Sequence, residues 1–411
     1  MNVPRLATRE RQGWAYRHHE PAFTALVLVL ILLVSAASAS AQSRSGGSDE
    51  FETSARSAIL LDTATGSVLF EKGADELVAP ASTSKLMTLT IVFDALKGKL
   101  LSLDDEVRVS ENAWRKGGAP SRTSAMMVPV NTSVSVSELL RGVIVASGND
   151  ASIAFAEHLA GSEETFARML EKKAREIGLV RSTFRNATGL PDPEHLMTAR
   201  EIGLLARHIV LNYPEFYPLF GEREFRYRTH RFVNRNQLLT QDIGVDGMKT
   251  GFTRGAGYNL VASAVQDGRR LIAVVTGLDT QQGRTREARR MLEWGFSVAI
   301  EVTLFEPGEI VSSALVWGGS RLSVPLIAEA AAVVVVPRQS IAQRMRAEIV
   351  YQGPLRAPIQ RGQQVATLRV TAPNRASAEV PLKAAEDVPK TGFVWRGMQS
   401  LYFIARRSVG L

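Results

Sequence analysis

Cysteine is absent from this chain of 411 residues, and its absence removes several kinds of chemistry. Without thiols the protein can form no disulfide, no thiolate nucleophile and no thiolate metal site, so its stability has to come from its core. Histidine is scarce as well, because only six are present and none belongs to an HExxH motif or a similar ligand spacing. A zinc peptidase is therefore excluded, and we expect no metal and no cofactor.

Charge of one sign is not in large excess either. The 49 basic and 41 acidic residues are interspersed, and the formal net charge of +8 is modest for this length. Because zinc-finger spacing and an aromatic ribonucleoprotein signature are both missing, nucleic acid is not an expected partner. A basic surface suits an anionic membrane or a wall polymer equally well. A hydrophobic content of 45% without long low-complexity tracts predicts a folded chain of two or three domains.

The main apolar run covers residues 22–37, near the N-terminus. Four arginines precede it, and Ala39 and Ala41 then form an A-x-A pattern before Gln42. This arrangement predicts a bacterial export signal over residues 1–41, followed by a Ser- and Gly-rich linker over residues 42–54. An uncleaved anchor is the alternative, although the run is short for a membrane span. We therefore expect an exported protein.

Turn signals and apolar periodicity predict a mixed fold for residues 55–303. Two short apolar runs at 58–62 and 67–71 flank a Thr-Ala-Thr-Gly turn and predict a hairpin. Further strands are expected at 260–265 and 270–276, on either side of an Asp-Gly turn. Segments with helical periodicity lie at 83–96, 137–145, 151–159, 163–177, 198–211 and 285–296. Helices inserted between early and late strands are typical of an α+β domain with an antiparallel sheet.

The pattern changes after about residue 304. Short β-rich runs separated by Gly and Pro, among them 331–336, 347–351 and 364–370, predict a small all-β domain over residues 304–388. The tail over residues 389–411 is aromatic and apolar with bracketing arginines, and it is too short and too charged to span a bilayer. It predicts an amphipathic helix in a membrane interface, with a helix packed on its own protein as the alternative.

Three short motifs follow one another along the chain and carry the functional signal. They are Ser82-Thr83-Ser84-Lys85, Ser147-Gly148-Asn149 and Lys249-Thr250-Gly251. Each alone is weak, so their order and context decide. A second Lys390-Thr391-Gly392 has no strand pattern around it, and we interpret that copy as coincidental. In this order the motifs indicate an active-site serine acyltransferase.

The first motif pairs a hydroxyl with an amine. A serine is a poor nucleophile at neutral pH and needs a base within reach, and helical spacing brings Lys85 beside Ser82. Lysine acts as a base only if its pKa falls, which burial and a second cation such as Lys249 both favour. The helix N-terminus also welcomes negative charge near the Ser82 N–H.

The other two motifs supply proton transfer and substrate binding. Ser147 can relay a proton to the leaving group, while the Asn149 amide can donate to substrate and hold Lys85. We expect the third motif on an edge strand, where Lys249 and Thr250 bind a carboxylate. There Gly251 lets a backbone come close, and the N–H of Phe252 completes an oxyanion hole.

Longer strings around the motifs resemble the serine D-alanyl-D-alanine carboxypeptidases, the class C low-molecular-mass penicillin-binding proteins of peptidase family S11. The strings are Ser82-Thr83-Ser84-Lys85, Ser147-Gly148-Asn149-Asp150-Ala151, Val245-Asp246-Gly247-Met248-Lys249-Thr250-Gly251 and Ala256-Gly257-Tyr258-Asn259-Leu260. The resemblance covers residues from about 55 to 300 and, less specifically, the β-rich part and the tail. It implies a penicilloyl-serine transferase domain, similar to β-lactamases and transpeptidases, with a sheet flanked by helices, then a β-domain and a membrane-associating helix.

The same resemblance implies an activity and a set of roles. Ser82 would be acylated by a peptidoglycan stem peptide with release of the terminal D-alanine, and β-lactams would inhibit it. Lys85 would accept the proton, Ser147 and Asn149 would relay it, and Lys249 with Thr250 would bind the carboxylate. Arg284 falls where the family places a further active-site arginine, and Phe252 stands where some relatives carry a polar residue. The implied location is periplasmic, on the outer face of the inner membrane.

Three rival functions are weighed against this one. A β-lactamase would need a Glu in an ExxxN-type loop for deacylation, and the stretch 181–196 contains no such pattern. A D,D-endopeptidase that cuts peptidoglycan crosslinks shares the motifs, but the β-domain and tail favour the carboxypeptidase. A non-catalytic wall-binding module is disfavoured because Ser82 and Lys85 are both intact.

Overall fold

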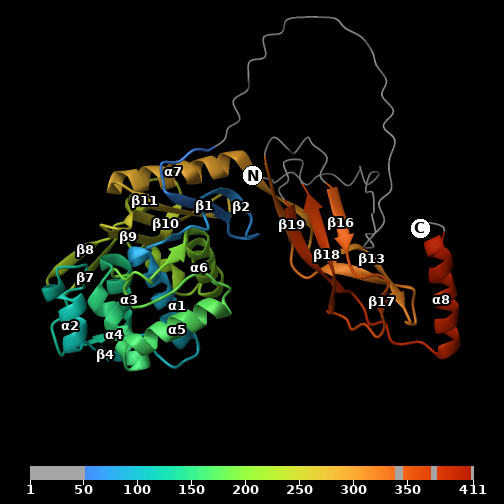
Figure 1. The fold of residues 1–411 in the computed structure, drawn as a ribbon, viewed down its shortest axis with the longest axis horizontal. Helices are drawn as coiled ribbons and strands as arrows, with labels where there is room; N and C mark the ends of the chain where they lie inside the picture. The colour runs from blue at the N-terminus through green and yellow to red at the C-terminus, as the bar shows by residue number, and fades with distance from the viewer. Residues whose placement is uncertain (1–50, 338–345, 372–376, 409–411) are drawn as a thin grey trace, which may run out of the picture. The chain divides into compact units, whose positions relative to one another are not determined.

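The computed structural model describes residues 51–337, 346–371 and 377–408, which fall into two compact units (Figure 1). One unit runs from Phe51 to Ala299 and the other begins at Ile300, within strand β12 (Ala299–Phe305). The predicted export signal and residues 42–50 of the linker lie outside the described residues.

A five-stranded antiparallel sheet forms the centre of the first unit, in the order β2-β1-β11-β10-β9 (Figure 1). Its strands are β1 (Ser57–Asp62), β2 (Val68–Lys72), β9 (Val245–Thr253), β10 (Gly257–Gln266) and β11 (Arg269–Leu278). The predicted hairpin and the two late strands are confirmed. Strand β9, which carries Lys249, lies at an edge of the sheet as expected.

Alternating side chains give this sheet two apolar faces, because successive residues of a strand point to opposite sides. In β11, Ile272 and Val274 belong to one core, whereas the intervening Ala273 belongs to the other. Helix α6 (Ala199–Asn212) packs on the first face and α7 (Gln281–Val298) on the second. The sheet is therefore covered on both sides, and most of its buried residues are apolar.

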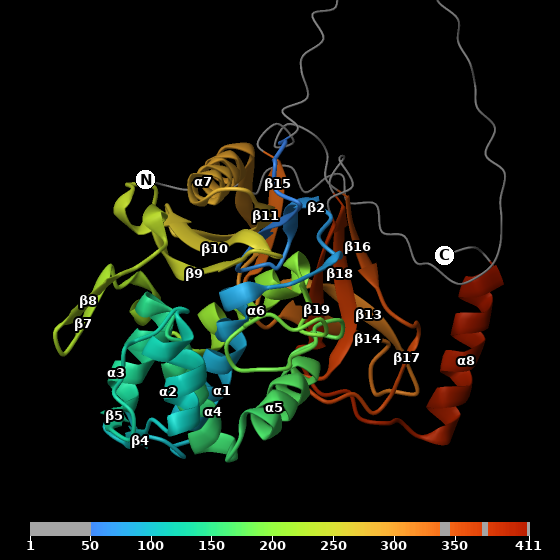
Figure 2. The same cartoon turned by 60° about the vertical axis from the view of Figure 1, so that its left-hand side comes forward.

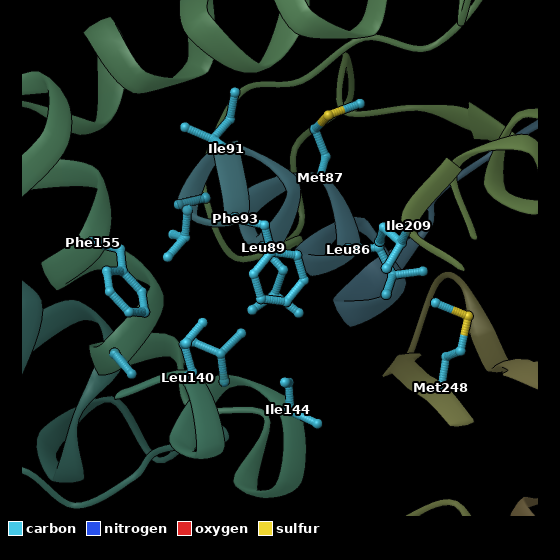
Figure 3. Close-up of a cluster of buried hydrophobic side chains, with 14 of the residues drawn as sticks. Leu86, Met87, Leu89, Ile91, Phe93, Leu140, Ile144, Phe155, Ile209 and Met248 are labelled. Atoms are coloured by element: carbon cyan, nitrogen blue, oxygen red, sulfur yellow. The ribbon is translucent and has the colours of Figure 1, made fainter. Parts of the chain in front are cut away.

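The helical half of this unit surrounds α1 (Lys85–Lys97), of which ten of thirteen residues are buried. Phe93 of α1, Leu140 and Phe155 lie in one cluster in Figure 3. The neighbouring helices are α3 (Val136–Arg141), α4 (Asn149–Ala160) and α5 (Glu163–Glu176). Burial on nearly every side explains why the apolar residues of α1 form no single stripe.

Three local features differ from the sequence expectations. The helix predicted over 137–145 stops at Arg141 and continues as a π-turn, η3 (Gly142–Ala146), which ends at Ser147 with φ +57°. The segment predicted as helix from residue 83 starts with a 3₁₀ turn, η1 (Ala81–Ser84), before α1. Short elements were not anticipated because they have too few residues for periodicity. They are α2 (Glu111–Gly117), the pairs β3 (Leu77–Val78) with β6 (Met197–Thr198) and β4 (Glu106–Arg108) with β5 (Ser133–Ser135), the hairpin β7 (Glu224–Tyr227) with β8 (His230–Val233), and the 3₁₀ turns η2 (Ala119–Ser121), η4 (Tyr217–Gly221) and η5 (Gln237–Thr240).

The second unit is built on a six-stranded sheet in the order β16-β18-β19-β14-β13-β17, with β12 paired to β15. Its strands are β13 (Ile310–Trp317), β14 (Ser323–Ala328), β15 (Ala332–Pro337), β16 (Arg346–Val350), β17 (Leu355–Arg356), β18 (Gln364–Thr371) and β19 (Ser377–Ala384). The predicted β-rich character of this part of the chain is confirmed. The coincidental Lys390-Thr391-Gly392 belongs to this unit and leads into the last helix.

That last helix is α8 (Phe393–Ser408), and its polar residues attach it to the β-unit. Gln399 is buried, accepts a hydrogen bond from the Gly318 N–H (2.7 Å) and donates one to the Gly319 carbonyl (2.8 Å). Ser400 accepts a third hydrogen bond, from Trp317 Nε1 at 3.0 Å. Within the residues that the structure describes, no helix combines the length and hydropathy that crossing a bilayer needs.

Candidate active site

The turn that carries Ser82 is held in place by hydrogen bonds from neighbouring side chains. Ala81, just before it, adopts a left-handed conformation with φ +51°. Thr83 Oγ1 donates to the Pro80 carbonyl at 2.7 Å, and Asn259 Nδ2 donates to the same oxygen at 3.1 Å. Asn259 stands on β10, where its Oδ1 also accepts from the Gly277 N–H at 2.9 Å. The hydroxyl-bearing turn is therefore tied to the central sheet.

Lys85 opens α1 and lies beside the Ser82 hydroxyl, with 2.9 Å between Nζ and Oγ. Its Nζ also contacts Asn149 Oδ1 at 2.7 Å and the Thr188 carbonyl oxygen at 2.5 Å. Both of those oxygens can only accept. A neutral amine has two N–H groups for them, and this leaves its lone pair for the proton of Ser82.

The surroundings of Lys85 favour that neutral form. The side chain is fully buried, and burial, with Arg235 nearby, lowers its pKa to about 7. The buried carboxylate of Asp150 acts in the opposite direction and limits the decrease. An amine whose pKa lies near neutrality can accept a proton at the pH where it works.

The second motif lies at the junction of η3 and α4. Its Asn149 spans the site, because Oδ1 holds Lys85 and Nδ2 donates to Thr123 Oγ1 at 2.9 Å. The next residue, Asp150, is buried and accepts from the N–H groups of Met126 (2.8 Å) and Val128 (3.2 Å). These contacts fix the segment that contains Thr123 against the start of α4.

Lys249 on β9 reaches the second motif from the opposite wall, with 2.9 Å between its Nζ and Ser147 Oγ. It is 2% exposed. Burial lowers its pKa well below the ordinary value, and the nearby cations Lys85, Arg235 and Arg284 lower it further. The first and third motifs thus both contact the second, Lys85 through Asn149 and Lys249 through Ser147, and we call the region where the three motifs meet the cleft.

Gly251 on β9 passes so close to the Ser82 turn that only glycine fits. A Cβ at this position would lie 2.9 Å from the Pro80 carbonyl oxygen and 3.2 Å from the Ser82 nitrogen. The sequence expectation that a backbone comes close here is confirmed, and the backbone is that of the Ser82 turn. Phe252 is half-exposed and stacks on Tyr258 with 4.2 Å between ring centroids.

Two arginines line the same wall. Arg284 of α7 donates to the Gly251 carbonyl at 3.2 Å and to the Arg235 carbonyl at 3.4 Å, and burial lowers its pKa to about 10. The Arg235 side chain donates to Ser124 Oγ (2.7 Å) and to the Ala146 carbonyl (3.2 Å). Arg284 therefore contacts the backbone of the third motif, and the carbonyl of a second arginine, Arg235, lies beside it.

A cavity of about 500 Å³ opens on the Ser82 side of this cleft. It is lined by residues 79–81, 189–193 and 253–255 and by His195. His195 is buried against Phe184, and burial lowers its pKa to about 4. Glu194 is exposed and pairs with Arg185 at 3.1 Å, away from the buried amines.

Some residues of this site have no short motif that announces them. Thr188 contributes only a carbonyl oxygen, which any residue type carries, so the sequence holds no signal for it. Arg235 and Thr123 lie in segments without periodicity, and Asn259 occurs in the string 256–260 but in none of the three short motifs. Among the described residues no group of three His, Asp or Glu side chains is placed to hold a metal ion.

A hydroxyl paired with a buried, weakly basic lysine, opposite a wall rich in cations, defines an active-site serine acyltransferase. A sequence profile of the D-alanyl-D-alanine carboxypeptidases, peptidase family S11, matches residues 38–280. A second profile, the C-terminal domain of penicillin-binding protein 5, matches residues 301–390. The chain belongs to the D-alanyl-D-alanine carboxypeptidase family.

Individual relatives agree with this assignment along most of the chain. D-alanyl-D-alanine carboxypeptidase DacC of Escherichia coli K12 is 40% identical over 344 residues, which cover 83% of this chain and 86% of the relative. DacF of Bacillus subtilis is 35% identical over 84% of this chain and 89% of its own. The crystal structure of penicillin-binding protein 5 from Haemophilus influenzae superposes with a TM-score of 0.77 at 34% identity, covering 84% of this chain and 100% of that one.

Proposed function

We propose that this chain is a penicillin-sensitive serine D-alanyl-D-alanine carboxypeptidase that removes the terminal D-alanine from peptidoglycan pentapeptide stems. The observation that carries the proposal is the 2.9 Å contact between Ser82 Oγ and the fully buried Nζ of Lys85. The relative DacC of Escherichia coli K12 is named for this reaction. An ampicillin-bound structure is known for penicillin-binding protein D2 of Listeria monocytogenes, which is 27% identical with a TM-score of 0.52, over 60% of this chain and 99% of that one.

Acylation begins when the Ser82 hydroxyl attacks the carbonyl carbon of the penultimate D-alanine. Its proton passes to the lone pair of Lys85, a new C–O bond forms, and the carbonyl becomes an oxyanion. The N–H groups of Ser82 and Phe252 stabilise that oxyanion, as backbone donors do in other acyl transfers. The C–N bond then breaks, and the leaving amine takes the proton that Lys85 had accepted, relayed through Ser147, so that Lys85 is neutral again.

The same groups release the product. Water attacks the ester carbonyl and gives its proton to Lys85, the C–O bond to Ser82 breaks, and the serine recovers a proton. Ser147 suits the relay because its hydroxyl accepts from Lys249 at 2.9 Å and can both accept and donate. Asn149 keeps Lys85 in place during both steps.

The substrate carboxylate is assigned to the cationic wall. Lys249 and Thr250 would bind it directly, with Gly251 and Phe252 supplying backbone groups. Arg284 adds positive charge next to these residues, because its side chain donates a hydrogen bond to the Gly251 carbonyl. A free C-terminal carboxylate is the feature that a carboxypeptidase has to recognise, and charged donors in a buried site bind it strongly.

Covalent labelling tests the central assignment. Protein that lacks residues 1–41 should be labelled by a fluorescent penicillin, and Ser82→Ala should abolish the labelling. Ser84→Ala is the matched control, because its hydroxyl lies on the same turn but donates to the Ala81 carbonyl. Persistent labelling of the Ser82→Ala protein would remove the proposed nucleophile.

Mass spectrometry separates the carboxypeptidase from the endopeptidase. A digest of pentapeptide muropeptides should lose one D-alanine per stem while dimeric crosslinked muropeptides stay intact. Conversion of dimers to monomers without loss of D-alanine would favour the endopeptidase. An unchanged digest would indicate a non-catalytic wall-binding protein.

We place the protein in the periplasm, peripherally on the outer face of the inner membrane, with α8 as the contact. The docked face of α8 is polar, and the opposite face exposes Val394, Met398 and Leu401, the last of these 70% exposed. A helix that presents an apolar face to solvent suits insertion into a bilayer interface. The export signal over residues 1–41 remains a sequence prediction.

Vesicle sedimentation tests this contact. Leu401→Asp should reduce co-sedimentation with phospholipid vesicles while penicillin labelling stays unchanged. A matched control is Lys383→Gln, which changes the charge by the same amount in the same unit but on strand β19. Equal binding of both variants and the wild type would refute the membrane role of α8.

A further inference from the structure

The hairpin of β7 and β8 extends outward from the catalytic unit (Figure 2) and carries an unusual concentration of arginine. Residues 222–235 include five arginines and two glutamates. Both glutamates already have arginine partners, since Glu222 pairs with Arg141 at 3.0 Å and Glu224 pairs with Arg231. The remaining positive charge of this segment has no carboxylate partner among the described residues.

The two faces of the hairpin differ in character because side chains alternate along each strand. Phe225 and Tyr227 are buried in the large core, and Phe232 stacks with Phe225 at 6.3 Å. Arg226 lies between Phe225 and Tyr227 in the sequence, Arg228 follows Tyr227, and both arginines are exposed. We call the exposed residues Arg226 and Arg228 the arginine face.

The register of the two strands works against stability on this face. Arg226 stands directly opposite Arg231, and like charges at facing positions of an antiparallel pair destabilise it. Arg231 forms the ion pair with Glu224, and the more distant charge of Arg226 also acts on that one carboxylate, so two arginines share a single negative charge. An anion above the arginine face would relieve this repulsion, and the cation–π contact of Arg228 with the Tyr227 ring, at 5.6 Å, leaves its positive charge in place.

The hairpin is also joined to the active site. Both strands pack on η3, the turn that ends at Ser147, and the chain leaving β8 reaches Arg235, whose side chain donates to the Ala146 carbonyl. Arg235 is the seventh residue after Arg228, so an extended segment places the tip within about 25 Å of the cleft. A polymer that occupies the cleft with one stem can reach the hairpin with another part.

We infer that the arginine face binds carboxylates of the peptidoglycan polymer outside the cleft, on stem peptides other than the one being cut. This inference rests on the proposed function, because it takes the substrate to be that polymer. Stem peptides end in carboxylates and repeat along the polymer, so they match an exposed pair of arginines by charge and by multiplicity. The contact holds the enzyme on polymeric substrate and adds nothing for a short peptide.

The test compares two substrates with one double variant, Arg226→Gln with Arg228→Gln. D-alanine release from a short acylated peptide ending in D-alanyl-D-alanine should be unchanged, as should penicillin labelling. Release of D-alanine from intact, pentapeptide-rich peptidoglycan at low salt should fall about tenfold, because the variant loses two exposed charges that attract the polymer. In 0.5 M salt these charges are screened, so the variant and the wild type should release D-alanine at the same rate. Lys99→Gln with Lys172→Gln is the control, because it removes the same charge from exposed sites at the end of α1 and on α5.

Each outcome decides the inference. Equal loss on both substrates would mean that the hairpin supports the active site structurally, and loss on neither would mean that its arginines bind no polymer. Loss of co-sedimentation with anionic phospholipid vesicles, with unchanged polymer cleavage, would assign the face to lipid. Sedimentation of the inactive Ser82→Ala protein with insoluble peptidoglycan measures the contact without catalysis, so failure of the proposed activity is distinguishable from failure of this inference.

Discussion

The neutral amine of Lys85 leads to a quantitative prediction about pH. A lysine with the ordinary pKa of 10.5 is neutral in about one molecule in three thousand at pH 7, whereas a pKa of about 7 makes it neutral in about half. Between pH 6 and pH 8 the neutral fraction therefore rises about tenfold. If Lys85 is the base, the second-order rate constant for acylation by a fluorescent penicillin should rise by the same factor.

The variant Arg235→Gln tests the cause of the shift. Arg235 lowers the pKa of Lys85 through its charge, so its removal should move the midpoint of the profile to higher pH. The measurement is the rate constant of acylation by the fluorescent penicillin, determined for wild type and variant from pH 5.5 to pH 9 at constant ionic strength. A flat wild-type profile over this range, or a midpoint near that of ordinary lysine, would refute the assignment of Lys85 as the base.

The same shift affects folding stability with a definite sign. Because the folded pKa of about 7 lies below the unfolded value of 10.5, the unfolded state binds more protons between these two pH values. Stability should therefore rise with pH across that window, by a total of order 5 kcal/mol from this group. Below pH 7 the contribution is constant, since Lys85 is protonated in both states.

Three further changes have expected outcomes. Gly251→Ala places a Cβ 2.9 Å from the Pro80 carbonyl oxygen, so acylation by penicillin should slow by at least about tenfold. Acylation at the wild-type rate would contradict the close contact between Gly251 and the Ser82 turn. Phe252→Ala should change acylation by less than about threefold, because the proposed role uses the backbone N–H; a loss above about a hundredfold would assign a role to the ring. Asp62→Ala removes the buried carboxylate that Arg269 contacts at 2.9 Å, so Tm in thermal unfolding should decrease by about 10 °C. An unchanged Tm would show that this ion pair does not stabilise the fold.

Much of this fold was predictable because its signals are local. The two strands around the Asp-Gly turn and the helices beginning near Glu163 and Ala199 have clear periods and boundaries, and the structure confirms them. Ser147 shows the limit of such reasoning, because its left-handed conformation follows from a π-turn that departs from helical periodicity. The 3₁₀ turn at Ser82 likewise depends on hydrogen bonds from Asn259, a residue far away in the sequence.

The candidate site divides in the same way. The motif residues could be found because their side chains perform the chemistry, and chemistry restricts residue type. Thr188 offers only its main-chain oxygen, and Arg235 acts through charge at a distance, so neither leaves a pattern of fixed spacing. Three-dimensional proximity alone identifies them.

The cleft gathers Lys85, Lys249, Arg235 and Arg284, with Asp150 as a buried acid beside the second motif. In the proposed reaction, the carboxylate at the chain end of the substrate supplies the charge that opposes these basic groups. A ligand that brings a carboxylate should therefore raise the melting temperature, whereas its amide should not. Selectivity for free peptide ends would then originate in relief of the repulsion between Arg235 and Arg284 as much as in any bond to the substrate.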